Sequence, residues 1–170
     1  MAVYVQSHMS STVTMKTTFI LNGKTTVGFV REGMEEYLSR LRHYLPVETI
    51  VLPEVKSVKG LTPSVQMERE ADLMLKHIAP TDHVVLLDEH GKEFRSVELA
   101  DWLNKRLARN RNLVFVVGGP YGFSRRMKDR ADELLSISRL TFSHQMIRLL
   151  FLEQLYRACT ILKGEPYHHE

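Results

Sequence analysis

Cysteine and long hydrophobic runs are both scarce in this sequence. Cys159 is the only cysteine among 170 residues, so an internal disulfide is excluded, and a structural zinc site usually needs several thiolate or imidazole ligands. No apolar stretch approaches the roughly 20 residues of a transmembrane helix, so we expect no membrane association. A reducing compartment is the simplest explanation of the single cysteine, and we therefore predict a cytoplasmic protein.

Net charge is also low, at +3 for pH 7 with an isoelectric point near 9.0. Such a small excess favours a nucleic-acid partner only mildly. The basic residues gather in two groups on either side of a glycine-rich segment, where they would form a track for phosphates. Each group alone is more typical of a solvated helix face. The groups are Lys105, Arg106, Arg109 and Arg111, and Arg125, Arg126, Lys128 and Arg130.

The length fits one domain, and the first fourteen residues differ from the rest. They are rich in Ser, Thr and Val and contain no Asp, Glu or Lys. They also lack the basic start and continuous apolar stretch of a signal peptide. We expect a disordered N-terminal extension over residues 1–14 and a single domain over residues 15–170.

Strand and helix patterns alternate along that domain. Strands are predicted at residues 17–21, 47–52, 84–87 and 113–117, with a short one around 137–142 and a polar loop at 88–91. Helices are predicted at 31–45, from Thr62 towards Pro80, from Ser96 to Leu107, after Ser124, and at 143–163. The alternation predicts an α/β fold with a mainly parallel sheet and helices on both faces.

Such sheets bind ligands beyond the carboxyl ends of their strands, here the loops after Leu87 and Val117 and the segment 136–146. Glycines at 118, 119 and 122 would let the backbone approach a ligand, although a tight strand-to-helix turn explains them equally well. Small hydroxyl residues in the segment 136–146 would satisfy a polar ligand, although a half-buried strand is the simpler interpretation. The sequence has no Walker P-loop or full dinucleotide fingerprint, so phosphate binding is poorly supported.

The last predicted helix is apolar nearly all round, which is typical of a helix that is buried or covered by a partner. In a chain of this size a two-fold dimer interface is a good explanation. Arg148 and Arg157 lie in this helix and need a carboxylate or a phosphate, and Glu153 is a candidate partner for Arg148. His168 and His169 follow, but neighbouring side chains rarely ligate one metal together, so we expect no metal site.

Four segments carry a family resemblance: Leu86–Lys92, Phe115–Gly122, Thr141–Arg148 and Pro166–Glu170. In this order they closely resemble the RlmH family of ribosomal RNA large-subunit pseudouridine N3-methyltransferases, which belong to the SPOUT superfamily. The resemblance covers nearly all of residues 15–170. It implies a SPOUT-type homodimer in which the C-terminal part of the domain is threaded into a trefoil knot.

The resemblance also implies a cofactor and a substrate. The cofactor is S-adenosyl-L-methionine, and the substrate is a pseudouridine of large-subunit (23S) rRNA, methylated on N3 within the assembled ribosome. A non-catalytic RNA- or ribosome-binding α/β module is the alternative, and it would keep the basic groups but lack cofactor affinity. The implied cofactor-binding residues are Leu87, Gly118, Ile137, Ser138, Arg139, Leu140, Thr141 and Phe142.

Three residues towards the C-terminus are candidates for catalysis. By hypothesis, Tyr167 and His168 reach the cofactor pocket of the partner subunit, where they position or deprotonate the base. Arg157 would hold a nearby phosphate or the tail itself. These roles follow from the family resemblance, and the spacing of the residues does not establish them.

Overall fold

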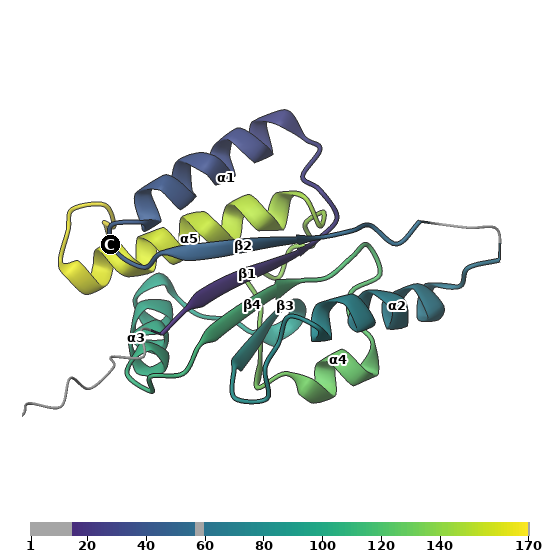
Figure 1. The fold of residues 1–170 in the computed structure, drawn as a ribbon. Coiled ribbons are helices and arrows are strands. Elements are labelled where there is room, and N and C mark those ends of the chain that lie inside the picture. Colours follow the sequence, from purple (N-terminus) through teal and green to yellow (C-terminus); the bar gives the residue numbers. More distant parts are fainter. Residues whose placement is uncertain (1–14, 57–59, 170) are drawn as a thin grey trace, which may run out of the picture.

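A computed structural model describes residues 15–56 and 60–169 of the chain. The expected extension over residues 1–14 lies outside the described residues. The described part forms one sheet with helices packed on it (Figure 1).

Five parallel strands form the sheet, in the order β2-β1-β4-β3-β5. The central strand β4 is apolar and buried along its whole length, as expected for a strand covered on both faces. The parallel arrangement confirms the predicted fold class, and the C-terminal knot stays a prediction. The strands are β1 (Thr17–Asn22), β2 (Val47–Leu52), β3 (His83–Lys92), β4 (Leu113–Val117) and β5 (Glu133–Leu135).

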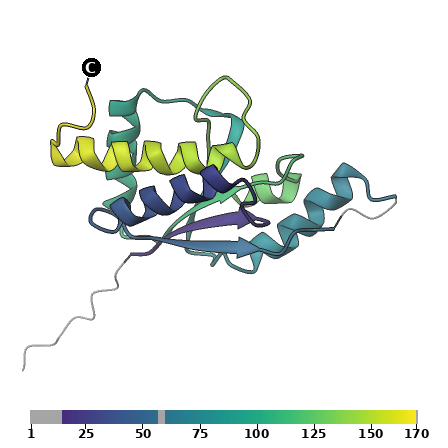
Figure 2. The same ribbon diagram turned by 90° about the horizontal axis from the view of Figure 1, so that it is seen from above.

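Helices cover both faces of the sheet, as predicted (Figures 1 and 2). One face carries α1 (Gly28–Leu41), α3 (Ser96–Leu107) and α5 (Met146–Lys163), and α5 packs against both α1 and α3. The other face carries α2 (Pro63–Leu75) and α4 (Arg125–Arg130). None of the helices in the described ranges is long and apolar enough to span a membrane.

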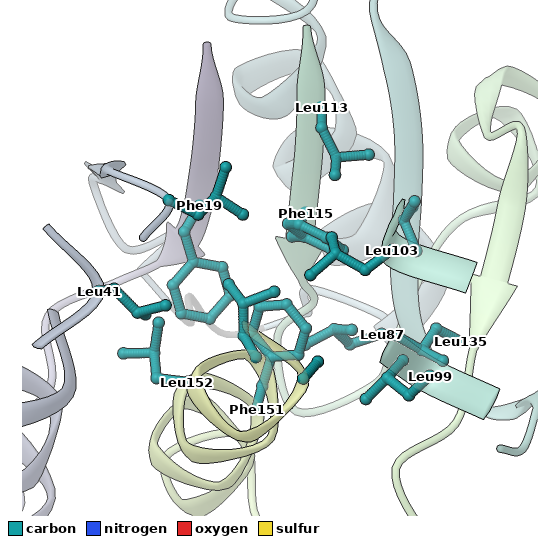
Figure 3. Close-up of a cluster of buried hydrophobic side chains, with 14 of the residues drawn as sticks. Phe19, Leu41, Leu87, Leu99, Leu103, Leu113, Phe115, Leu135, Phe151 and Leu152 are labelled. Carbon is teal, nitrogen blue, oxygen red and sulfur yellow. The ribbon is translucent and has the colours of Figure 1, made fainter. Parts of the chain in front are cut away.

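Aromatic rings join α5 to the sheet (Figure 3). The ring centroid of Phe151 lies 5.1 Å from that of Phe19 in β1 and 4.7 Å from that of Phe115 in β4. Leu152 and Leu155 of α5 are buried in the same cluster. The apolar surface of the last helix is therefore largely covered by its own chain, and the dimer stays a prediction.

An ionic network fixes the short strand β5 to the rest of the fold. Glu133 accepts hydrogen bonds from Trp102 Nε1 at 2.8 Å and from Arg106 Nη2 at 2.6 Å, and its Oε1 lies 2.7 Å from His83 Nε2. Burial opposes ionisation of this carboxyl, but the three hydrogen-bonding partners outweigh burial and lower its pKa to about 2. Arg106, one of the clustered cations, is thus held inside the fold.

The predicted strand at residues 137–142 is wrong, because these residues form a loop. The strand of this region is β5, which ends at Leu135. Beyond it, Ser136 Oγ donates to the carbonyl of Ser138 at 2.9 Å, and Leu140 N donates to Ser138 Oγ at 3.0 Å. These local side-chain bonds replace the partners that a strand would need.

The polar loop predicted at residues 88–91 is also wrong, because β3 continues through it to Lys92. The pairing with β5 is irregular between Leu87 and Lys92, and both residues pair with Leu135. Gly91 makes this possible, since a Cβ at that position would lie 2.6 Å from backbone atoms of Leu134 and Leu135.

Several helix boundaries follow the predicted caps and others do not. Thr62 Oγ1 accepts from the amide of Val65, and Ser124 Oγ accepts from the amide of Met127, each at 3.3 Å, so both predicted caps are confirmed. Helix α2 ends at Leu75, short of the predicted limit near Pro80.

Two other helices begin at different residues from those predicted. Helix α1 spans Gly28–Leu41 rather than 31–45, because Val30 is buried in the core and the chain after Leu41 forms a turn. Helix α3 is preceded by Arg95 as its cap residue, whose amide donates to Glu98 Oε2 at 2.9 Å, so Ser96 is already helical. Gly164, with φ 68°, ends α5 as expected.

Candidate cofactor site

A cavity of about 410 Å³ lies at the edge of the sheet formed by the second half of β3 and by the carboxyl ends of β4 and β5. Its size falls within the roughly 300–1,000 Å³ of small-molecule pockets. The location agrees with the edge that the parallel sheet predicts for a ligand. Its lining is formed by Leu87–His90, Val117–Phe123, Lys128, Leu135–Ser138, Leu140–His144 and Ile147.

The glycine-rich loop after β4 forms one wall of the cavity. A Cβ on Gly118 would lie 2.9 Å from the carbonyl oxygen of Gly122, and a Cβ on Gly119 would lie 2.6 Å from both carboxylate oxygens of Glu70. The amide of Gly122 donates to the carbonyl of Gly119 at 3.1 Å, and Gly122 has φ +80°. The loop is therefore a tight turn, as one of the two sequence interpretations predicted, and close approach of its backbone to a ligand stays a prediction.

Carboxylates from the end of β3 form a second wall. Asp88 pairs with Lys128 Nζ at 3.1 Å and with His90 Nδ1 at 3.1 Å. Burial opposes ionisation of Asp88, but hydrogen bonds from His90 and Lys128 outweigh it and lower the pKa of this carboxyl. Glu89 accepts a hydrogen bond from Thr141 Oγ1 at 2.9 Å, which joins this wall to the loop at 136–145.

The loop after β5 forms the third wall, and it contains most of the residues assigned to the cofactor by resemblance. Leu140 is 71% exposed at the rim. Arg139 does not line the cavity, because its side chain is 89% exposed and its Nε donates to Glu93 Oε2 at 3.1 Å. The structure therefore brings together Leu87, Gly118, Ile137, Ser138, Leu140, Thr141 and Phe142, and leaves Arg139 outside.

Lys128, His144 and Ile147 line the cavity, although sequence reasoning did not assign them to the cofactor. His144 lies in the segment 136–146 that was expected to contact a ligand, and Lys128 lies in one of the two basic groups. His144 and Ile147 are three residues apart at the start of α5 and share one face there. That spacing is the signal that would have found them. The contact that holds Lys128 at the cavity could not be predicted from the local sequence, because its partner Asp88 is 40 positions away along the chain.

Arg148 fixes the start of α5 to the end of β1. Its side chain is fully buried, and Nε donates to the carbonyl of His144 at 2.9 Å. Nη1 donates to the carbonyl of Gly23 at 3.0 Å and to Thr25 Oγ1 at 2.8 Å, while Nη2 donates to the carbonyl of Asn22 at 2.7 Å. Burial lowers the pKa of this guanidinium. The residue thus holds His144 at the cavity.

Glu153 is not the partner of Arg148, so that candidate pairing is wrong. Glu153 Oε1 accepts from Arg157 Nη2 at 2.5 Å and from the hydroxyl of Tyr167 at 3.1 Å. Neutral oxygens around Arg148 satisfy the guanidinium instead, and their positions depend on how β1 and α5 pack.

The three catalytic candidates gather at the C-terminal end of α5. The guanidinium of Arg157 lies 4.8 Å from the ring centroid of Tyr167, and its Nη1 is 3.5 Å from His168 Nδ1. Burial, aided by a hydrogen bond to Tyr37, raises the pKa of Tyr167 above its usual value. Arg157 therefore contacts the tail of its own chain, and its role in catalysis stays a prediction.

This tail cluster is distant from the cavity of its own chain. Ile147 of the cavity and Arg157 of the tail cluster are ten residues apart on α5, a rise of roughly 15 Å. The chain end and the cavity-lining loops lie at opposite ends of the fold in Figure 1. His168 instead borders a second hollow of about 420 Å³, lined also by Arg95, Ser96 and His169.

Comparison with known proteins identifies the family. A family model described as "Predicted SPOUT methyltransferase" matches residues 15–168. The chain belongs to this methyltransferase family. Among curated relatives, "Ribosomal RNA large subunit methyltransferase H" of Bacteroides fragilis is 53% identical over 157 residues, covering 92% of this chain and all of the relative. Proteins of the same name from Parabacteroides distasonis and Porphyromonas gingivalis are 52% and 46% identical over the same shares.

A methyltransferase of this family needs a methyl donor, and the cavity has suitable walls for one. The lining combines apolar side chains from β3, β5 and the following loop with the carboxylates Asp88 and Glu89. Gly118 and Gly119 line the cavity, and neither has room for a Cβ because Gly122 and Glu70 lie close to them, so glycine is needed at both positions. This combination suits a ligand with a flat apolar part and a cationic or hydroxyl-bearing part.

Many cations of the two basic groups are engaged within the methyltransferase itself. Arg126 pairs with Asp72 at 2.6 Å, and Lys128 and Arg106 are occupied as described above. The predicted phosphate track therefore has fewer free charges than the sequence indicates. Within residues 15–56 and 60–169, no group of three or more His, Cys, Asp or Glu side chains is arranged to hold a metal ion.

Proposed function

We propose that this chain methylates N3 of a pseudouridine in large-subunit (23S) rRNA, using S-adenosyl-L-methionine as the methyl donor. The observation that carries this proposal is the cavity, whose walls contain seven of the eight residues that the RlmH resemblance assigns to the cofactor. The relatives at 46–53% identity, which are named as large-subunit rRNA methyltransferases, support the substrate class. The proposed setting is the assembled ribosome in the cytoplasm.

The walls of the cavity suggest how the chain would hold this cofactor. Leu87, Ile137 and Phe142 offer apolar surface for the adenine, and Asp88 and Glu89 offer acceptors for hydroxyl or ammonium groups. When bound, the cofactor supplies an electrophilic methyl group on sulfur. The contribution of the chain is to hold the acceptor nitrogen in line with that methyl group, and such positioning alone accelerates a reaction strongly.

The proposed active unit is a homodimer of single SPOUT domains, each spanning residues 15–170 with the C-terminal knot of the family. Within one chain the tail cluster and the cavity lie roughly 15 Å apart along α5, so Tyr167 and His168 would act at the cavity of the partner subunit. Tyr121 and Leu140 at the cavity rim are 54% and 71% exposed. A second copy would cover these apolar side chains.

The test compares the full-length protein with a variant that ends at Pro166, on ribosomes that lack the modification. The full-length protein is expected to bind S-adenosylmethionine and transfer its methyl group. The truncated variant is expected to bind the cofactor with similar affinity in calorimetry and to lose transfer, because it lacks Tyr167 and His168. Sedimentation of both proteins checks that dimers persist.

Two outcomes would contradict parts of this proposal. Unchanged turnover in the truncated variant would show that Tyr167 and His168 take no part in the reaction. A folded full-length protein with no affinity for the cofactor would favour the non-catalytic RNA- or ribosome-binding module instead.

A further inference from the structure

His144 occupies a fixed position on the cavity wall, where the loop at 136–145 enters α5. Its carbonyl accepts from Arg148 Nε at 2.9 Å. The neighbouring Gln145 is also fixed, because its Oε1 accepts from the amide of Thr26 at 2.9 Å and its Nε2 donates to the carbonyl of Lys24 at 3.1 Å. The backbone that carries the half-buried imidazole is therefore held by Arg148 and by the bonds of Gln145.

The other titratable side chains on the wall are already engaged or exposed. Asp88 is shared by Lys128 and His90, and Glu89 accepts from a threonine hydroxyl. His90 is largely exposed. His144, by contrast, has no ion-pair partner within 4.0 Å among the described residues, and its nearest polar side-chain contact is Gln145 Nε2 at 3.5 Å from its Nε2. Its ring keeps a nitrogen available for a ligand.

Charges around His144 suit a group that is neutral at rest and briefly charged. Burial lowers the pKa of His144, and the positive Arg148 lowers it further. Glu54, after β2, and Glu70, on α2, act in the opposite direction without reversing the shift. Glu70 is 2% exposed, and its Oε2 has no hydrogen-bond partner among the described residues. The two carboxylates therefore offset part of the cost that burial and Arg148 impose on a protonated imidazole.

We propose that His144, in the chain that holds the methyl donor, accepts the proton that leaves N3 of the pseudouridine. This inference rests on the proposed function and deepens it. The N3–H electron pair stays on nitrogen and forms the new N–CH₃ bond, while the C–S bond breaks and its electrons remain on sulfur, which becomes a neutral thioether. The proton moves to the neutral imidazole and is then released to solvent. The tail of the partner subunit would position the pseudouridine.

The experiment uses full-length protein and three variants: His144→Gln, His144→Ala and, as a matched control, His77→Gln. His77 is exposed at the end of α2, away from the cavity lining. Circular dichroism and cofactor calorimetry first check that each variant folds and binds S-adenosylmethionine. Methyl transfer to unmodified ribosomes is then measured from about pH 5.5 to about pH 9.5, that is, from about one unit below to about three units above the ordinary pKa of histidine.

His144→Gln is expected to retain cofactor binding within about twofold and to lose a factor of roughly 10²–10⁴ in kcat, the usual contribution of a general base. In the wild type, kcat falls at acidic pH as His144 becomes protonated, and this limb is expected to disappear in the variant. The loss in kcat of His144→Gln should become smaller at high pH, where N3 of the pseudouridine loses its proton without a general base. Added imidazole should partly restore His144→Ala, which a purely structural loss would not allow.

Equal kcat and equal pH profiles for His144→Gln and the wild type would overturn the inference while leaving the proposed function intact. Absence of any methyl transfer by the wild-type protein would contradict both the inference and the proposed function. If His144→Gln proves unstable, the imidazole response of His144→Ala decides the question, and no response at full cofactor occupancy counts against the inference.

Discussion

Replacing Arg148 with methionine tests how strongly one buried cation holds the site together. The substitution keeps a long apolar side chain and removes every donor of the guanidinium. Four oxygens then lose their partner: the carbonyls of Asn22, Gly23 and His144, and the hydroxyl of Thr25. The end of β1 and the start of α5 would lose these bonds and keep those that Gln145 makes with Lys24 and Thr26.

The expected change in the free energy of unfolding for Arg148→Met results from two opposing contributions. Four hydrogen bonds to a charged group at about 1.5–3 kcal/mol each sum to roughly 6–12 kcal/mol. Burial of the guanidinium opposes this sum by several kcal/mol, because the charge leaves water. A net loss of about 3–5 kcal/mol in the free energy of unfolding is therefore expected for Arg148→Met.

Urea unfolding followed by circular dichroism measures the loss, with Arg125→Met as the matched control. The side chain of Arg125 is 90% exposed and pairs only with Asp129 one turn away, so its replacement should change stability by less than about 0.5 kcal/mol. A stability of Arg148→Met within about 1 kcal/mol of the wild type would refute the reasoning, since it would show that the four oxygens find other partners.

Two further substitutions test the packing and the ionic network. Gly91→Ala places a Cβ 2.6 Å from the backbone of Leu134 and Leu135, which cannot move aside cheaply, so urea unfolding should show a loss of at least about 2 kcal/mol, whereas Gly28→Ala meets no atom within 4 Å and should be neutral. Equal stabilities for the two would contradict this. The pKa of Glu133 is lowered from 4.5 to about 2 in the fold, so wild-type stability should fall as the pH drops from about 4.5 to about 2, and Glu133→Gln should lose less over that window in acid unfolding. An equal loss of stability in the wild type and Glu133→Gln over this pH range would contradict a stabilising role for ionised Glu133.

The elements that sequence reasoning placed correctly are those defined by local composition. Strand β4 was predicted to the residue, because a run of five apolar residues rich in valine and closed by two glycines favours a buried strand over a helix. Strand β5 could not be predicted, since it is three residues long and depends on Glu133 contacting His83 and Trp102 from distant parts of the chain. The predicted strand at 137–142 failed because serine side chains there bond to nearby backbone.

The location of the site followed from the sheet, whereas its detailed contacts did not. Chain segments at the carboxyl ends of parallel strands share an edge, so the position of the cavity beside Leu87 and Gly118 could be predicted from the alternation of strands and helices. The partners of Arg148 could not, because they are mainly backbone carbonyls that no residue pattern marks. The exposed position of Arg139 likewise depends on Glu93, a contact set by the path of the loop.

One measurement tests the central claim most directly: transfer of labelled methyl groups from S-adenosylmethionine to ribosomes that lack the modification. Ribosomes without pseudouridine at the target serve as the control, and digestion of the RNA locates the label on the base. The proposed function predicts label in large-subunit RNA, on N3 of pseudouridine, and none in the control. Intact ribosomes left unlabelled by folded protein, or equal labelling of both ribosome samples, would contradict it.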